Sequence, residues 1–430
     1  MKKILYFIMI FLTIQGVLVA SEVKDVEVKG EKIPLIYERD SNLPIASMQV
    51  IFKASGSMTE KKAGIARFTA KMLNEGTKTA GSVGFAKLLE SKAIHLSVNS
   101  GSETFVFEIS SLKEEFKEAV GFLKDLLNDP NFTQESFNKI KTMTLGNLKQ
   151  KETDYDYIAS VNLKMLMFKN TPIGHPFLGD YESVSSFTLK EIEDFAKERL
   201  VLERVIVVTG GDLSEDEAKR YSKEILETLP KGQKGKIGFY DANDKELEKI
   251  IKKEDTKQAY IYFGSPYFLK VNDKDNYKSK VASFILGAGG FGSRLMEEVR
   301  VKRGLAYSAY GRVNLTKSYS DFTGYLQTKL ESSKEAQKVV KDVIKKFTEE
   351  GVTKEELEQA KKFLLGSEPL RNETLSQRLS KAFFEYYHGF EQGYYKKQLE
   401  LIKNLSLEDL NRFIKKHTEI NKLTFAIVTK

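Results

Sequence analysis

The 430-residue sequence contains no cysteine and no tryptophan, and it has only four histidines. Without cysteine the chain has no disulfide, no thiolate nucleophile, no sulfur ligand for zinc and no lipid-attachment site. The histidines are too far apart in sequence for any two to lie one helical turn from each other; they are His95, His175, His388 and His417. A zinc site built on a histidine pair within one helix is therefore excluded.

Residues 1–20 have the layout of a secretory signal peptide. Two lysines precede an apolar run from Ile4 to Leu12, and small residues occur near Ala20 and Ser21. An uncleaved membrane anchor is the alternative, but this run is short for a bilayer, and Thr13 and Gln15 come directly after it. We predict cleavage after Ala20 or Ser21, and a periplasmic or secreted protein with no membrane association afterwards.

Charge of one sign does not dominate the chain. It has 68 Lys and Arg against 60 Asp and Glu, a formal net charge of +8, and the two signs alternate along the sequence. Nucleic-acid binding would need a localised basic face, and only the short segments 231–236 and 249–253 are rich in lysine. We expect a mixed-charge surface and no nucleic-acid partner.

Two segments that lie roughly 220 residues apart resemble each other. This spacing is far longer than that of a stacked repeat. Thr188–Phe195 and Ser406–Phe413 each read as a capped amphipathic helix, and an apolar strand follows each of them at 204–209 and 423–429. The spacing indicates a duplicated domain. We predict domains at 22–229 and 241–430, joined by a Gly- and Lys-rich linker at 230–240. The alternative is that any two helix-strand pairs look alike.

Predicted strands come in adjacent groups between blocks of helices. This order favours an α+β fold of two homologous domains, each a mainly antiparallel sheet packed against helices. A helix is expected near 64–74, and strands are expected near 24–28, 34–38, 47–53, 95–99, 104–110, 259–263, 307–313 and 321–328.

The segment Ala63–Thr77 resembles the active-site helix of the pitrilysin and insulinase family of zinc peptidases. That family has the pattern Gly-x-x-His-x-x-Glu-His-Met-x-x-x-Gly-Thr, in which the histidines bind zinc and the glutamate activates water. The framing residues remain at Gly64, Met72, Gly76 and Thr77. The three functional positions instead hold Arg67, Ala70 and Lys71.

The resemblance also implies a third zinc ligand, a glutamate on a later helix. Counting the family spacing from Lys71 reaches Asn147. These positions are neutral or cationic, and cationic side chains repel a divalent ion. We predict that this chain binds no metal and no other cofactor, and that zinc belongs to a partner.

The segment Phe291–Tyr307 resembles the Arg-to-Tyr signature of the same family. In the family, the two side chains reach the zinc site of the opposite half or of a partner subunit. The tyrosine donates to the developing oxyanion and the arginine orients the substrate. The matching residues are Arg300 and Tyr307. The alternative is that Arg300 caps a helix and Tyr307 packs at a strand end.

A glycine-rich loop at 287–292 fits the pattern G-x-G-x-x-G. It follows a predicted helix rather than a strand, and no βαβ unit surrounds it, so dinucleotide binding is disfavoured. In the family, a flexible loop here contacts the substrate. The resemblance thus gives substrate-binding roles to Gly289, Gly290, Phe291 and Gly292.

Together, these resemblances imply a half-clamshell of two domains. The leading hypothesis is a non-catalytic subunit of an exported heterodimeric zinc peptidase, which binds peptide in part by strand addition and lends Arg300 and Tyr307 to its partner. A second hypothesis is a structural or peptide-binding protein with no role in proteolysis. A third, an autonomous peptidase with displaced ligands, is disfavoured by the scattered histidines.

Overall fold

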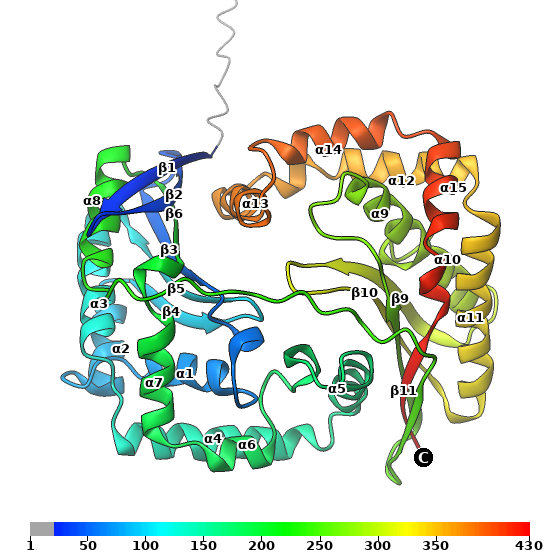
Figure 1. Cartoon of the computed structure of the whole chain (residues 1–430), viewed down its shortest axis with the longest axis horizontal. Coiled ribbons are helices and arrows are strands. Elements are labelled where there is room, and N and C mark those ends of the chain that lie inside the picture. Colours follow the sequence, from blue (N-terminus) through cyan, green and yellow to red (C-terminus); the bar gives the residue numbers. More distant parts are fainter. Residues whose placement is uncertain (1–20) are drawn as a thin grey trace, which may run out of the picture.

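The computed structural model describes residues 21–430, so the predicted signal peptide at 1–20 lies outside the described residues. The chain folds into two halves, each with one twisted sheet and a surround of helices (Figure 1). This confirms the predicted α+β class and the pairing of sheet with helices. No helix within residues 21–430 has both the length and the apolar character needed to cross a bilayer.

The first half contains a six-stranded sheet and eight helices among the described residues. Short 3-10 turns join several of the elements. In chain order they are β1 (Glu22–Val28), β2 (Glu31–Arg39), β3 (Ile45–Lys53), α1 (Ile65–Leu73), α2 (Gly81–Ser91), β4 (His95–Ser100), β5 (Thr104–Leu112), α3 (Phe116–Asn128), α4 (Gln134–Lys151), α5 (Tyr155–Met167), α6 (Tyr181–Ser186), α7 (Leu189–Arg199), β6 (Val205–Gly211) and α8 (Glu215–Leu226).

The second half contains a five-stranded sheet, and two π-helical turns, Phe284–Ala288 and Glu297–Val301, continue α9 and α10. Its elements are β7 (Glu248–Lys252), β8 (Gln258–Pro266), α9 (Asn276–Ser283), α10 (Arg294–Met296), β9 (Ala306–Leu315), β10 (Ser320–Lys329), α11 (Ser333–Glu350), α12 (Lys354–Gly366), α13 (Leu375–His388), α14 (Tyr394–Lys403), α15 (Leu407–Lys416) and β11 (Thr424–Thr429).

Both sheets are mainly antiparallel. The strand order is β1-β2-β6-β3-β5-β4 in the first sheet and β7-β11-β8-β10-β9 in the second. Among the strands of residues 21–430, only the pairs β2 with β6 and β11 with β7 are parallel. The two segments that look alike in sequence form α7 with β6 and α15 with β11. The hydroxyl of Thr188 accepts from the amide of Glu191, and that of Ser406 accepts from the amide of Asp409, so both helices begin with the expected cap.

Each half lends one helix to the sheet of the other half. Helix α13 lies against β2 and β6, where Leu379 and Tyr387 join Ile36, Ile206 and Val208 in one apolar cluster. Helix α5 lies in turn against β8 and β11 of the second sheet. Both helices lie between the two sheets in Figure 1. Strand β6 is buried along its whole length because it is covered on both faces.

The region after α8 differs most from the sequence-based expectation. Residues 230–247 form an extended connection without helix or strand, which is longer than the predicted linker at 230–240. Strand β7 then forms within a segment that reads as lysine-rich surface, and most of its residues are exposed. It shows no alternation of apolar and polar residues because backbone pairing with β11 holds it in place, rather than burial of one face.

Candidate functional site

Helix α1 begins without a side-chain cap of its own. Gly64 precedes it with φ of +86°, and the carboxylate of Glu60 accepts from the amides of Gly64 at 2.8 Å and Ala66 at 3.2 Å. Glu60 is buried, and this burial raises its pKa to about 7 although both amides act in the opposite direction. The loop before α1 therefore supplies the anchor that orients the helix.

The two cations of α1 lie one turn apart on the same face. The ammonium of Lys71 donates to the hydroxyl of Thr144 on α4 at 3.0 Å. Burial, and secondarily the charge of Arg67, lower the pKa of Lys71. The guanidinium of Arg67 lies 5.9 Å from the ring centre of Phe177, and its buried Nε has no hydrogen-bond partner within residues 21–430.

The residue of α4 that contacts Lys71 is Thr144, whereas counting along the sequence points to Asn147. Asn147 is exposed on the outer side of α4. Three residues rotate a helix by about 300°, so the two side chains lie about 60° apart around the axis, and the face that packs on α1 includes Thr144 but not Asn147. Counting fixes a position along the chain but not the helical phase, which depends on how α4 packs against α1.

The residues at this site do not fit a zinc ion. Arg67 and Lys71 are cations that offer no lone pair, Ala70 is a buried methyl group, and Thr144 is a neutral hydroxyl already engaged by Lys71. Throughout residues 21–430, no three His, Asp or Glu side chains are grouped in a way that could hold a metal. We therefore derive no metal-dependent step for this chain.

Strand β4 forms the free edge of the first sheet beside α1. At Val98 the backbone hydrogen-bonding groups of this edge are already occupied. The side-chain nitrogen of Asn74 donates to the Val98 carbonyl at 2.7 Å, and the side-chain oxygen of Asn74 accepts from the Val98 amide at 2.9 Å. The backbone amides and carbonyls of Leu96 and Ser100 point to the same edge, because alternate residues of a strand direct these groups to the same side. A peptide that adds to β4 must therefore displace Asn74 or pair with the strand on either side of it.

In the second half, three side chains form a stack that is exposed to solvent. The guanidinium of Arg300 lies 4.4 Å from the ring centre of Tyr307 and 4.8 Å from that of Phe291. The stack joins the predicted Arg300 and Tyr307 to the glycine-rich loop. Tyr307 is 83% exposed and Phe291 is 72% exposed, although aromatic side chains usually bury most of their area.

The backbone around the stack has unusual features. Arg300 lies in the π-helical turn Glu297–Val301, in which the amide of Lys302 donates to the carbonyl of Glu297. Such turns are often found at functional sites. In the loop, Gly290 has φ of +65° and Gly292 has φ of +90°, and these backbone angles hold Phe291 out from the surface.

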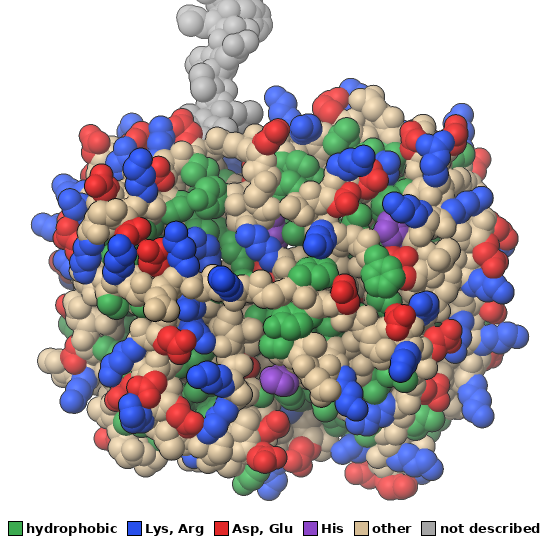
Figure 2. Space-filling view, in the orientation of Figure 1, with side chains coloured by type: hydrophobic (Ala, Val, Ile, Leu, Met, Phe, Trp, Pro, Cys, Tyr) green, Lys and Arg blue, Asp and Glu red, His purple; other side chains and the backbone are tan. Residues whose placement is uncertain are grey.

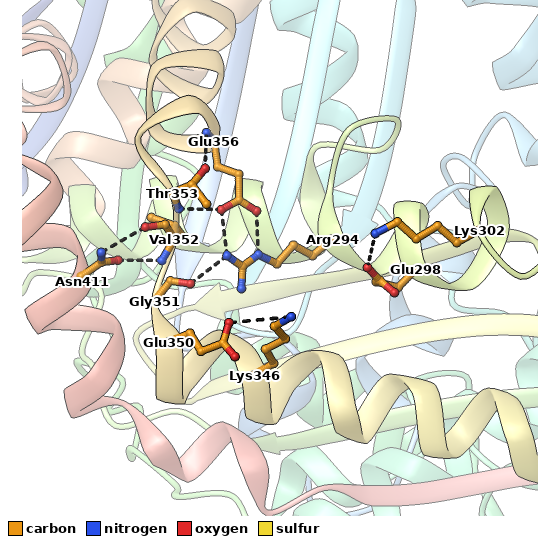
Figure 3. A network of polar contacts seen from close by, with 10 residues as sticks. All are labelled: Arg294, Glu298, Lys302, Lys346, Glu350, Gly351, Val352, Thr353, Glu356 and Asn411. Atoms are coloured by element: carbon orange, nitrogen blue, oxygen red, sulfur yellow. Dashed lines mark hydrogen bonds and ion pairs between the residues drawn. The ribbon is translucent and has the colours of Figure 1, made fainter.

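Arg294 fixes the base of this segment, a role that was not predicted from the sequence. Its guanidinium donates twice to the carboxylate of Glu356, at 2.6 and 2.7 Å, and once to the carbonyl of Gly351 (Figure 3). Asn411 in turn holds Val352 on the same turn between α11 and α12. Arg294 is therefore a positioning residue for the helix that carries Arg300. In the sequence, this role could have been inferred only from the presence of a basic residue beside apolar neighbours in a predicted helix.

The aromatic stack is far from α1. Figure 1 shows α1 and α10 on opposite sides of the molecule, and a projection can shorten a separation but never lengthen it. No hydrogen bond or ion pair links Arg300 or Tyr307 with Arg67 or Lys71 in the described part of the chain. Arg300 and Tyr307 are thus placed away from the degenerate helix of their own chain.

Comparisons with known proteins find matches in both halves of the chain. A family model described as "Insulinase (Peptidase family M16)" matches residues 35–181, and one described as "Peptidase M16 inactive domain" matches residues 186–364. The chain is 44% identical over 432 residues to "Non-peptidase homolog YmxG" of Helicobacter pylori, with 100% of this chain and 99% of that protein covered.

Two solved structures share the fold. One is the peptidase M16 inactive domain from Pseudomonas fluorescens, with a TM-score of 0.87 and 24% identity over 95% of this chain and 98% of that one. The other is a protease from Helicobacter pylori, with a TM-score of 0.83 and 17% identity over 96% and 100%. The fold thus occurs under both descriptions and does not decide activity. On the family models and the 44% identical relative, this chain belongs to the M16 peptidase family.

Proposed function

We propose that this chain is the non-catalytic subunit of a heterodimeric zinc peptidase, in which a second M16 chain with an intact zinc motif carries out the cleavage. The chain's own site supports the first part of this proposal, because cationic side chains occupy the positions of the family's zinc ligands on α1. Any contribution of this chain to catalysis must then come from other residues, whose side chains can contact a substrate.

The exposed stack of Phe291, Arg300 and Tyr307 is the observation that carries the proposal. A phenol can donate a hydrogen bond to an oxyanion. A guanidinium can form paired hydrogen bonds with a carbonyl or carboxylate group. The stack points into solvent rather than toward α1 of the same chain. It is therefore available to a second chain, and burial in that interface would account for two large exposed aromatic side chains.

The peptide would be held partly by the sheets. Strand β4 offers backbone groups on both sides of Val98, and strand addition to such an edge supplies hydrogen bonds that do not depend on sequence. Localisation in the periplasm or outside the cell completes the proposal, and it rests on the composition of residues 1–20.

The test is to mix the purified chain with an M16 chain that retains His-x-x-Glu-His, and to follow hydrolysis of an internally quenched peptide. We expect no cleavage by this chain alone and cleavage by the mixture. Tyr307→Phe should lower kcat about 100-fold, because one donor to the oxyanion is lost. Arg300→Ala should act mainly by raising KM.

Tyr181→Phe is a matched control, because Tyr181 is 65% exposed and lies on α6, away from the stack. Chelator-sensitive cleavage by the isolated chain would contradict the proposal. Full activity in a mixture that carries both Arg300→Ala and Tyr307→Phe would also contradict it, and would assign this chain a structural or peptide-holding role.

A further inference from the structure

A cavity of about 640 Å³ lies in the second half, between α9, the edge strand β9 and α12 to α14. The glycine-rich loop reaches it through Gly289, but the exposed stack does not line it. It therefore requires a separate explanation. Its lining includes three cations, Lys280, Arg312 and Arg371, and no aspartate or glutamate.

None of these three cations forms an ion pair with another described residue. The ammonium of Lys280 donates only to the side-chain oxygen of Gln398, at 2.8 Å. The side chains of Arg312 and Arg371 make no hydrogen bond within residues 21–430. Three positive charges around one cavity repel one another, and a bound anion would relieve this repulsion.

The nearest carboxylates are already engaged elsewhere. Glu368 accepts from Lys381 and from the side chain of Asn372, and Glu385 accepts from the amides of Gly393 and Tyr395. Neither carboxylate lines the cavity. The ionisable groups that line the cavity are thus the three cations together with two phenols, Tyr310 and Tyr395, and burial raises the pKa of Tyr395 to about 12. Glu368 and Lys381 act on Lys280 from outside the lining, and they pair with each other.

Besides the cations and several neutral polar groups, apolar side chains form much of the wall, among them Phe284, Phe363 and Val313. An inorganic anion would leave this surface exposed to water, whereas an organic anion with an apolar group beside its charge would cover it. The last residue of a peptide has this chemistry when its side chain is apolar.

We propose that this cavity binds the carboxylate of a peptide, which pairs with Lys280, Arg312 and Arg371 while the adjoining apolar side chain packs on the aromatic wall. That the ligand is a peptide rests on the proposed function. The preference for a carboxylate rests on the cavity alone. The carboxylate can be the chain terminus or an acidic side chain.

The ionisation of Lys280 supports this assignment. Burial, and secondarily the charge of Arg371, lower its pKa to about 8. The charged form is therefore complete below that pH and is lost as the pH rises through it. Binding of an anion should weaken above pH 8, and it should be accompanied by proton uptake near that pH.

The experiment is calorimetric titration of the isolated chain with three acetylated peptides. The first is Ala-Ala-Ala-Phe with a free terminus, the second is its terminal amide, and the third is Ala-Ala-Glu-Phe amide. We expect the free acid to bind about tenfold more tightly than its amide, which is the effect of one good ion pair. Equal affinity of the free acid and both amides would overturn the proposal. Tight binding of the glutamate peptide would identify an acidic side chain as the source of the carboxylate.

Lys280→Met and Arg312→Met should each remove most of the difference between acid and amide. Lys346→Met is the control, because Lys346 lies on the exposed face of α11 beside Glu350. Arg312 is exposed, so its variant tests the cavity without a risk to folding. Wild-type discrimination in both variants would contradict the assignment. Failure of the partner mixture to cleave would leave this result unaffected, since no partner is present.

Discussion

At the scale of single residues, Lys71 shows what occupies the position of a zinc ligand in this chain. Its ammonium is partly buried, faces Arg67 one turn away and has only a hydroxyl as partner. The lowered pKa means that the folded chain releases this proton at a lower pH than the unfolded chain. The charged lysine therefore reduces stability, and the reduction diminishes as the pH rises toward the ordinary lysine pKa.

Lys71→Met should raise the free energy of unfolding by about 1 kcal/mol at pH 7, because it removes a partly desolvated charge. The difference from wild type should shrink as the pH rises toward the ordinary lysine pKa of 10.5. Urea denaturation at pH 7 and pH 10 measures both effects. Lys87→Met on α2 replaces an exposed lysine and should change little.

The identity of the site residues was available in sequence, but their contacts were not. Arg67, Lys71, Arg300 and Tyr307 could be located because their spacing matches a family pattern. The stacking of Arg300 between two rings, and the choice of Thr144 over Asn147, depend on π-helical turns and helix phase. Neither leaves a periodic signal in the sequence.

At the scale of elements, α1 depends on a carboxylate from outside the helix. Because burial raises the pKa of Glu60 to about 7, the folded chain binds a proton between pH 4.5 and 7 that the unfolded chain has released. The contribution of Glu60 to stability therefore falls as the pH rises through this window.

Glu60→Gln should leave the free energy of unfolding near pH 5 almost unchanged. Between pH 5 and pH 8, the wild-type chain should lose roughly 2 kcal/mol of stability that the variant retains. This change is smaller than the full pKa shift would give because part of the shift, between pH 4.5 and pH 5, lies below the range compared. Chemical denaturation at both pH values measures the effect. Glu90→Gln on the exposed side of α2 should keep the wild-type pH dependence.

Elements with regular apolar periodicity could be predicted, and those held by other forces could not. The strands that became β3, β5 and β10 alternate clearly, and their predicted ranges lie within the observed ones. β7 was missed because its pairing with β11 uses only the backbone. The extra length of the connection before it follows from the distance between the two sheets, which no local pattern records.

At the scale of the whole molecule, charged contacts join the two halves as well as apolar ones. Arg378 of α13 donates to Glu38 at 2.5 Å and to Asp40 at 2.6 Å, both at the end of β2. Glu38 is only 2% exposed. Charged side chains of both signs are spread over the face of the molecule that Figure 2 shows.

Arg378→Met should lower the free energy of unfolding by about 3–5 kcal/mol, because it leaves the buried Glu38 carboxylate without its charge partner. Thermal unfolding followed by calorimetry measures this change. Arg412→Met is the comparison, since Arg412 pairs with Glu408 and Asp409 on the exposed side of α15. A similar small effect in both variants would show that Arg378 does not hold the halves together.

The exchange of α5 and α13 also affects the order in which the chain can fold. The first sheet is complete once β6 is present, but α13, which covers one of its faces, begins only at Leu375. A first half that has folded without α13 therefore leaves Ile36, Ile206 and Val208 open to solvent. Apolar surface exposed in this way promotes aggregation, so the first half is protected only once the second half has folded onto it.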